Sequence, residues 1–229
     1  MARPTKKEQI PNLPEAIKET AWRHIAEKGA AALSLRAIAR QLKITAPAIY
    51  NYFPDRDSLV TSLIVAAYTS FGDWQLEACE AVPEHKLAER LEAVGMAYRN
   101  WALTYPQRYQ LIFGTPIPGY QAPIDQVLPS AARSIRALTS VIEALRMEGK
   151  LNAPDFPEVK QEFKFSFEAW KIYGGDIDIL SLSVAVLIWA RVHGIVSLEI
   201  AGNLPPFGPD GKGLYMYEMD AINRQFVKE

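Results

Sequence analysis

Basic, hydroxyl and aromatic side chains recur at helical spacing between residues 34 and 57. Arg36, Arg40 and Lys43 are four and three residues apart, so on one helix they form a single basic face. Two tyrosines follow on the next segment. Guanidinium, ammonium and phenol groups all donate hydrogen bonds to phosphate oxygens, whereas base edges are reached by side chains that enter a groove. The stretch is therefore typical of a surface that binds nucleic acid.

Two short helices would position these groups. Ser34 has the acceptor side chain that a helix N-cap needs. The apolar residues after it fall at i, i+3, i+4 and i+7, which predicts one buried stripe. The stripe consists of Leu35, Ile38, Ala39 and Leu42.

A second helix is expected to begin after Thr45 as its N-cap and to end before Pro54. Ile49 and Phe53 are four residues apart and should point inward. The opposite side then has small residues near the start of the helix, which permit close approach to base edges, and larger polar ones further along. The outward residues are Ala46, Pro47, Tyr50 and Asn51, with Ala48 at the edge.

These residues resemble the DNA-binding helix-turn-helix of the tetracycline-repressor (TetR-like) transcriptional regulators, from Thr45 through Ile49-Tyr50 and Phe53 to Asp57. The resemblance implies contact with DNA by Arg36 and contacts with phosphates by Tyr50, Tyr52 and Arg56. One departure is Lys43, which stands where the turn usually has glycine and would be strained in a left-handed conformation. An ordinary helical hairpin is the alternative. The predicted DNA-binding set is Arg36, Thr45, Ala46, Pro47, Ala48, Tyr50, Asn51, Tyr52 and Arg56.

The charge is distributed unevenly along the 229 residues, whose formal net charge is −1. Residues 1–60 have 10 Lys+Arg against 6 Asp+Glu, a net of +4, which leaves 15 against 20, a net of −5, for residues 61–229. The basic part coincides with the helix-turn-helix, as attraction to phosphates requires. Arg3, Lys6 and Lys7 form a short arm before it that either touches DNA or is a plain tail.

The remaining composition indicates a soluble protein of the cytoplasm. One cysteine, Cys79, excludes an intrachain disulfide and a cysteine-based zinc cluster, and no signal-like apolar run opens the chain. With 49% hydrophobic residues the chain can form a substantial core. We expect no cofactor and no bound metal, because the three histidines have no metal-ligand spacing.

The periodicity predicts an all-α fold with two domains, a helix-turn-helix head over residues 1–54 and a helical body for effector binding and dimerisation over 55–229. The head is completed by a helix from about residue 12 to 29. In the body, helices are expected over 55–82, 84–105, 106–113, 123–148, from 159 onward, 180–201 and 214–227. Residues 114–123 contain two glycines and three prolines and should be irregular, either as a lid or as a simple connection.

The helix expected over 180–201 is long and apolar enough to suggest a membrane span. It contains Arg191, His193 and Glu199, and each charge at bilayer depth costs about 2.5 to 3.5 kcal/mol for insertion, so a buried helix and no membrane are predicted. Trp189, His193 and Gly194 resemble the Trp-His-Gly signature of one C-terminal domain class of the same family. The three ionisable residues either line a ligand cavity or form a core or interface network.

The last helix has a stripe of large side chains, Tyr215, Met219, Ile222 and Phe226, which is suited to packing against another helix. We therefore expect a homodimer through the helices 180–201 and 214–227, bound to a pseudo-palindromic double-stranded DNA operator. An apolar or aromatic effector would release a repressor from DNA. Its predicted site is lined by aromatic residues: Trp101, Tyr105, Tyr109, Phe113, Phe167, Trp170, Trp189 and His193.

Two alternatives stay open. One is a DNA-binding protein without small-molecule control, which would need no cavity. The other is a helical enzyme, although the sequence has no paired carboxylates, Ser-His-Asp order, HExxH, Walker or GxGxxG pattern, so no catalytic residue is predicted. The sign of any ligand response is not determined by the sequence, because release from DNA and recruitment to it use the same fold.

Overall fold

The computed structural model describes residues 10–154, 156–204 and 210–228, without the side chains of residues 162, 163, 169, 173 and 174 in one of the helices. The described chain is helical, and its one strand-like feature is a single bridge between Leu151 and Val227. The elements are α1 Leu13–Lys28, a 3-10 turn Ala30–Ala32, α2 Leu35–Gln41, α3 Ala46–Tyr50, α4 Arg56–Glu80, α5 Leu87–Thr104, α6 Pro106–Phe113, α7 Ile124–Ser134, α8 Arg136–Met147, α9 Gln161–Gly174, α10 Ile179–Ile200 and α11 Lys212–Phe226.

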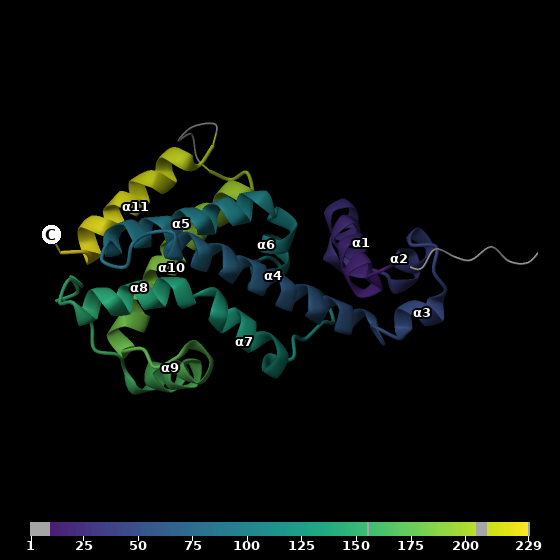
Figure 1. Cartoon of the computed structure of the whole chain (residues 1–229), viewed down its shortest axis with the longest axis horizontal. Coiled ribbons are helices and arrows are strands. Elements are labelled where there is room, and N and C mark those ends of the chain that lie inside the picture. Colours follow the sequence, from purple (N-terminus) through teal and green to yellow (C-terminus); the bar gives the residue numbers. More distant parts are fainter. Residues whose placement is uncertain (1–9, 155, 205–209, 229) are drawn as a thin grey trace, which may run out of the picture.

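The helices form two groups with separate cores (Figure 1). Helices α1 to α3 make a small head at one end of the molecule, and α5 to α11 make a larger body. Helix α4 runs through both: its first turns contribute Leu59 and Leu63 to the head core, and from Ala67 onward it belongs to the body core. A single rigid helix thus connects the two cores. The basic arm of residues 3–7 lies outside the described residues.

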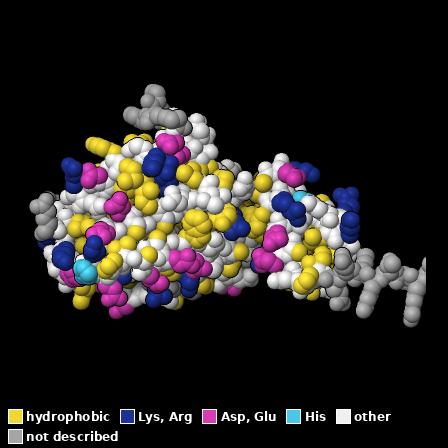
Figure 2. Space-filling model, turned by 45° about the horizontal axis from the view of Figure 1, so that its top comes forward, with side chains coloured by type: hydrophobic (Ala, Val, Ile, Leu, Met, Phe, Trp, Pro, Cys, Tyr) yellow, Lys and Arg dark blue, Asp and Glu magenta, His cyan; other side chains and the backbone are white. Residues whose placement is uncertain are grey.

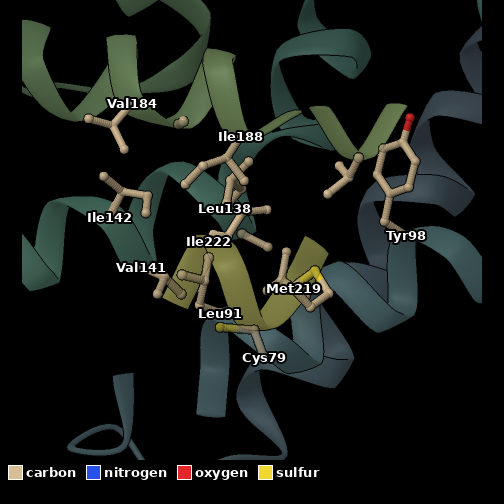
Figure 3. Close-up of a cluster of buried hydrophobic side chains, with 14 of the residues drawn as sticks. Cys79, Leu91, Tyr98, Leu138, Val141, Ile142, Val184, Ile188, Met219 and Ile222 are labelled. Carbon is tan, nitrogen blue, oxygen red and sulfur yellow. The ribbon is translucent and has the colours of Figure 1, made fainter. Parts of the chain in front are cut away.

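The body core is built from facing helices of distant parts of the chain (Figure 3). Leu91 of α5, Leu138 of α8, Ile188 of α10 and Ile222 of α11 are each at most 7% exposed and pack together. Burying side chains of this size contributes roughly 1.5–3 kcal/mol each. The predicted helix 123–148 is instead two helices, because the chain breaks at Ile135, where the Ser134 carbonyl accepts a hydrogen bond from Gln75 of α4.

The stripe predicted as a dimer seam on the last helix has another role. Tyr215, Met219, Ile222 and Phe226 are all at most 2% exposed within one protomer. The Tyr215 hydroxyl donates to the Gly95 carbonyl of α5, and Met219 lies so close to Gly95 that a Cβ there would clash with its sulfur. The prediction that this stripe forms the dimer interface is therefore wrong, because the stripe closes the body's own core.

Helix α10 is long and apolar enough to cross a membrane by composition alone, with a mean hydropathy of 1.9 in its most apolar window. Only 39% of that window is buried inside the protomer. The exposed part follows one face, with Leu187 50% and Leu198 44% exposed. The helix therefore serves the body core on one side and presents an apolar face on the other.

Candidate functional site

The turn between α2 and α3 has the predicted geometry. The Ser34 hydroxyl accepts from the Ala37 amide and starts α2, while Lys43 has a φ of 54°, the left-handed conformation expected at this position. His24 of α1 contacts Gln41 of α2 through Nε2 and Oε1, 2.6 Å apart, so α1 braces the turn. Lys43 thus lies in the turn between α2 and α3, and the His24–Gln41 contact holds α1 against α2.

Six of the nine predicted DNA-binding residues lie on α3 or at its two caps. Thr45 is at the N-cap position, but its side chain makes no capping hydrogen bond, so its exposed hydroxyl is available to a partner. Tyr50 and Tyr52 are 40% and 49% exposed, which is high for aromatic side chains. Ile49 and Phe53 are buried, as expected. Also exposed are Arg36, Ala46, Pro47 and Asn51, and Ala48 is half-buried.

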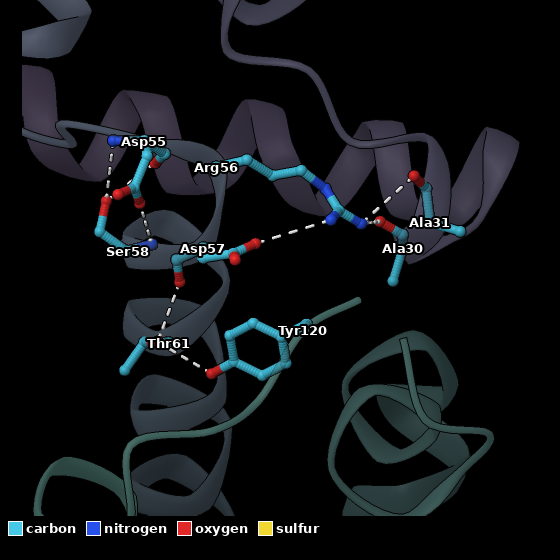
Figure 4. A network of polar contacts seen from close by, with 8 residues as sticks. All are labelled: Ala30, Ala31, Asp55, Arg56, Asp57, Ser58, Thr61 and Tyr120. Carbon is cyan, nitrogen blue, oxygen red and sulfur yellow. Dashed lines mark hydrogen bonds and ion pairs between the residues drawn. The ribbon is translucent and has the colours of Figure 1, made fainter. Parts of the chain in front are cut away.

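Arg56 is placed differently from the other predicted residues (Figure 4). Its guanidinium donates from Nη2 to the carbonyl oxygens of Ala30 and Ala31, at 3.3 Å each, and pairs with Asp57 at 3.6 Å. It is thus engaged inside the head with the turn that follows α1. A phosphate contact by Arg56 would require the guanidinium to leave these carbonyls.

The start of α4 is held by a capping box and by the segment of residues 114–123, here called the strap (Figure 4). Asp55 accepts from the Ser58 amide at 2.7 Å, and hydrogen bonds from Ser58 lower the pKa of the Asp55 carboxyl. Thr61, 6% exposed, donates to the Asp57 carbonyl and lies 2.8 Å from the Tyr120 hydroxyl of the strap. Because Ile117 and Tyr120 also pack on the head core, the strap ties the body to the head.

Basic side chains lie at the outer end of the head, where acidic ones are also present, and both kinds are scattered over the body (Figure 2). Arg36, Arg40 and Lys43 are all exposed, and none has a carboxylate partner within ion-pairing distance in the described chain. Free basic groups next to exposed tyrosines suit an anionic backbone.

The body has a polar network centred on His193 of α10. Its Nδ1 is 2.9 Å from the Tyr98 hydroxyl and 3.0 Å from the Tyr109 hydroxyl, and its Nε2 is 3.2 Å from the Ser197 hydroxyl. Both ring nitrogens of His193 face hydroxyl groups, which can donate or accept a hydrogen bond. This arrangement fits a neutral imidazole. Burial lowers the pKa of His193 and raises the pKa values of both tyrosines, so all three groups are uncharged at neutral pH.

Two ion pairs account for the other polar residues marked on α10. Arg99 and Glu199 have side chains only 7% and 10% exposed and share two hydrogen bonds, and the Gly211 amide also donates to Glu199. Arg191 pairs with Glu218 of α11 and donates to Gln225. Sequence reasoning missed Arg99, because 100 positions separate it from Glu199. Arg99 and Glu199 therefore form a buried ion pair, whereas Arg191, 35% exposed, makes its contacts near the surface.

A cavity of about 360 Å³ opens between α4, α6, α7, α9 and α10. Three of the predicted ligand residues line it: Phe113, Trp170 and Trp189. Trp189 also stacks on His193 at 5.0 Å between ring centroids, so the His193 network stands directly behind the cavity wall. The wall residues that sequence reasoning missed are Tyr68, Ala131, Ser134, Ile135 and Val186.

Other predicted ligand residues lie elsewhere. Trp101 is 0% exposed with its indole N–H donated to Ser70, and Tyr109 is 2% exposed, so both belong to the packed core. The guanidinium carbon of Arg108 lies over the Tyr105 ring, 4.4 Å from the ring centroid. Phe167 is half-buried on α9 but is not a wall residue of the cavity. An aromatic stripe at helical spacing more often packs in a core than lines a cavity, which explains why these residues lie away from the cavity wall.

The head and body also face each other across an open cleft of about 510 Å³. Ile25 and Ala31 of the head form one side, and Gln110 of α6 and Ile117 of the strap form the other. Arg108 of α6 reaches across to Trp22 of α1, 5.3 Å from the ring centroid. The head is therefore joined to the body by α4, by the strap and by this cation–π contact, with the open cleft between these links.

The chain matches two family descriptions that together span the head and most of the body. Residues 17–63 match the bacterial regulatory proteins of the tetR family, and residues 91–222 match the tetracyclin repressor-like C-terminal domain. The chain belongs to the TetR family. It is a DNA-binding transcriptional regulator, and members of this family bind DNA operators and act as dimers.

Known relatives agree with this assignment. The regulator is 36% identical over 196 residues to HTH-type transcriptional regulators of Mycobacterium tuberculosis and Mycobacterium bovis, covering 81% of this chain and 80% of theirs. Among solved structures, SCO4313, which is described as a regulatory protein, is 34% identical with a TM-score of 0.73 and covers 92% of this chain and 94% of its own. PfmR of Thermus thermophilus, at 17% identity and a TM-score of 0.59 over 93% and 99%, shares the fold.

The family assignment favours a regulator over the enzyme alternative, because the family is generally non-enzymatic. In the described part of the chain no three His, Cys, Asp or Glu residues form a group that could hold a metal.

Proposed function

We propose that this regulator is a dimeric repressor that leaves a pseudo-palindromic operator when an apolar or aromatic effector enters the body. The observation that carries the proposal is the combination of an outward-facing α3 surface and an apolar cavity, joined through one helix, α4. Residues 1–54 would form the DNA-binding domain and 55–229 the body, with the turns of α4 up to Ile64 folding together with the head. Such a regulator works in the cytoplasm.

The proposed DNA surface consists of exposed residues of α2 and α3 and omits Arg56. Arg36, Thr45 and the small residues at the start of α3 would face base edges, and Tyr50 and Tyr52 would donate to phosphates. The small side chains matter because they allow the helix to enter the major groove. The complete proposed set is Arg36, Thr45, Ala46, Pro47, Ala48, Tyr50, Asn51 and Tyr52.

The proposed dimer uses the exposed face of α10 together with α11. On α10 this face consists of Leu187, Ala190, Gly194, Leu198 and Ala201, at spacings of three and four residues. Met216 and Tyr217, 36% and 74% exposed, extend it onto α11. Small residues on the face let two helices approach closely. Two heads related by a two-fold axis can then occupy half-sites about 34–36 Å apart, or a multiple of that spacing.

Gly194 offers a clean test of this interface, because a Cβ added there would meet no atom of the protomer within 4 Å. Gly194→Trp should therefore fold normally and sediment as a monomer where the wild type is a dimer. Ala26→Trp, on the exposed side of α1, is the matched control and should remain dimeric. A dimeric Gly194→Trp variant would move the interface away from this face of α10.

The DNA surface is tested by titrating variants against the duplex that the wild-type protein selects from random DNA. Arg36→Ala should lower affinity by about 1–3 kcal/mol and relax the preference at one base position in each half-site. Tyr52→Phe should weaken binding to all sequences alike, because it removes a phosphate donor. Lys28→Ala, at the exposed end of α1, should have little effect. Equal, uniform losses for Arg36→Ala and Tyr52→Phe would place base readout elsewhere.

A further inference from the structure

Lys43 adopts a backbone conformation that is otherwise found at glycines in the described chain. Directly after α2, its amide donates to the Arg40 carbonyl at 3.1 Å, and the Ile44 amide donates to the Ala39 carbonyl at 3.0 Å, which is the Schellman arrangement. Its φ of 54° is the one positive value at a non-glycine residue among the described residues, where five glycines have positive values. A left-handed lysine is strained, because its Cβ crowds the following carbonyl oxygen. The turn should therefore be more stable with glycine.

The side chain of Lys43 does not compensate for this strain inside the protein. It is exposed, and its ammonium forms no ion pair with a carboxylate of the described chain. Arg36 and Arg40 precede it at spacings of four and three residues and are exposed as well. Like charges at such spacings repel one another and destabilise a helix. A bound anion would relieve this repulsion, so the row of cations suits an anionic partner.

Lys43 lies where the two helices of the motif meet. It precedes Thr45, the N-cap residue of α3, by two positions. In a helix-turn-helix bound to DNA, the first helix crosses the sugar-phosphate backbone and the second enters the major groove with its N-terminal residues. The turn between them is then next to the phosphates at the edge of that groove. Lysine contacts phosphate as a compact charge on a flexible stem, which can reach a neighbouring phosphate without a fixed geometry.

We propose that Lys43 contacts a backbone phosphate of the operator, and that a strained lysine stands in the turn because of this contact. The inference rests on the proposed DNA surface and extends it, since that surface contains no residue between α2 and Thr45. A phosphate carries no sequence information, so Lys43 raises the affinity for all duplex DNA alike. The lysine thus lowers the stability of the free protein and strengthens its binding to DNA.

The first test compares the melting of two DNA-free variants by calorimetry. Lys43→Gly removes both the strain and the charge, whereas Lys43→Ala removes the charge and keeps a Cβ in the left-handed conformation. Lys43→Gly should raise Tm by about 2 °C, because the strain is relieved. Lys43→Ala should stay within about 1 °C of the wild type. A Tm of Lys43→Gly below that of the wild type would overturn the claim that the lysine destabilises the turn.

The second test measures the affinity of the same variants for the selected operator at about 50 and about 200 mM salt. Both variants should reduce the slope of log affinity against log salt by about 0.9 unit per protomer, so the loss of affinity per protomer is about 3.5-fold greater at the lower salt. A random duplex should show the same reduction, because the contact is to phosphate. Lys43→Arg keeps the charge and should retain the wild-type slope.

Lys28→Ala is the matched control, because it removes the same charge from another exposed position of the head, and it should leave the slope unchanged. An equal reduction in Lys28→Ala would show a general effect of net charge and would overturn the contact. Unchanged slopes in the Lys43 variants would overturn it too. A reduction confined to one of Lys43→Gly and Lys43→Ala would come from the backbone and would equally contradict a phosphate contact.

Arg36→Ala and Tyr52→Phe, measured alongside, separate this inference from the proposed function. If these two variants weaken operator binding while the Lys43 variants keep the wild-type slope, the proposed DNA surface stands and the Lys43 contact fails. If the Lys43 variants have the reduced slope while Arg36→Ala binds as the wild type does, the contact stands and the proposed base readout fails. A wild-type protein that binds no duplex DNA would overturn both.

Discussion

The head and the body use their polar side chains in opposite ways. In the head, Arg36, Tyr50 and Tyr52 are exposed to solvent. The core beneath them is largely apolar, apart from the buried Thr20 and His24. In the body, Arg99, Glu199 and His193 are turned inward and bonded to one another or to tyrosines. The difference suggests that the head is built to present groups to a partner, whereas the body is built to hold one arrangement around a cavity.

If this contrast is correct, breaking an internal body contact should have the largest effect on stability. Arg99→Met leaves the Glu199 carboxylate buried without its ion-pair partner and should lower the free energy of unfolding by about 3–5 kcal/mol, measured by urea denaturation. Arg133→Met, which breaks an exposed pair with Asp73, should cost under about 1 kcal/mol. Similar losses of unfolding free energy for the two variants would show that the buried ion pair of the body is no more important than an exposed one.

Arg56 differs from the outward-facing polar residues of the head, because its guanidinium makes hydrogen bonds within the head. Arg56→Ala should destabilise the protein by about 2 kcal/mol through loss of its hydrogen bonds to Ala30 and Ala31. Arg40→Ala, an exposed head residue, should leave stability nearly unchanged.

The salt dependence of operator binding separates the two roles considered for Arg56. We expect Arg56→Ala to leave the slope of log affinity against log salt unchanged. A slope flattened by about one unit would show that the guanidinium leaves the carbonyls and contacts a phosphate, as the family resemblance implied.

The strap joins the two regions through one hydrogen bond between side chains. Tyr120→Phe removes the hydroxyl that faces Thr61 and should cost about 1 kcal/mol of unfolding free energy in thermal or urea melts. Tyr217→Phe, 74% exposed on α11, should cost nothing measurable. If the Tyr120 variant is equally unaffected, the strap does not hold the head through this contact.

The smallest expected effect is a pH dependence from His193. Because burial lowers its pKa below the ordinary 6.5, the unfolded chain takes up this proton at a higher pH than the folded one. Stability from this group is therefore complete above about pH 6.5 and falls as the pH drops toward the folded-state pKa. His193→Gln should show a smaller drop in Tm between pH 7 and pH 5 than the wild type. His85→Gln, at an exposed position, should keep the wild-type drop.

The head could be predicted nearly residue by residue, because caps, stripe, turn and outward groups all fall within 24 consecutive positions. Even the left-handed Lys43 was indicated by the sequence. The sequence could not indicate that Arg56 donates hydrogen bonds to the carbonyls of Ala30 and Ala31, because this contact depends on where α1 ends in space.

The helices of the body could be predicted more accurately than the residues of its cavity. Phe113, Trp170 and Trp189 of the predicted ligand set line the cavity, as do Tyr68, Ile135 and Val186, which were not predicted, whereas Trp101 lies in the packed core. Helical periodicity says which face of a helix is apolar, but not whether that face meets another helix or a void. For the same reason, the apolar stripe of α11 was predicted to form a dimer interface, whereas it packs against α5 of its own protomer.

Selection of bound sequences from random duplex DNA with the purified protein tests whether the outward surfaces of α2 and α3 in two protomers read DNA together. We expect an enriched pseudo-palindrome that is bound by two protomers, or by a multiple of two, with half-sites one helical turn apart or a multiple of it. Absence of enrichment, or a single asymmetric site bound by one protomer, would contradict it.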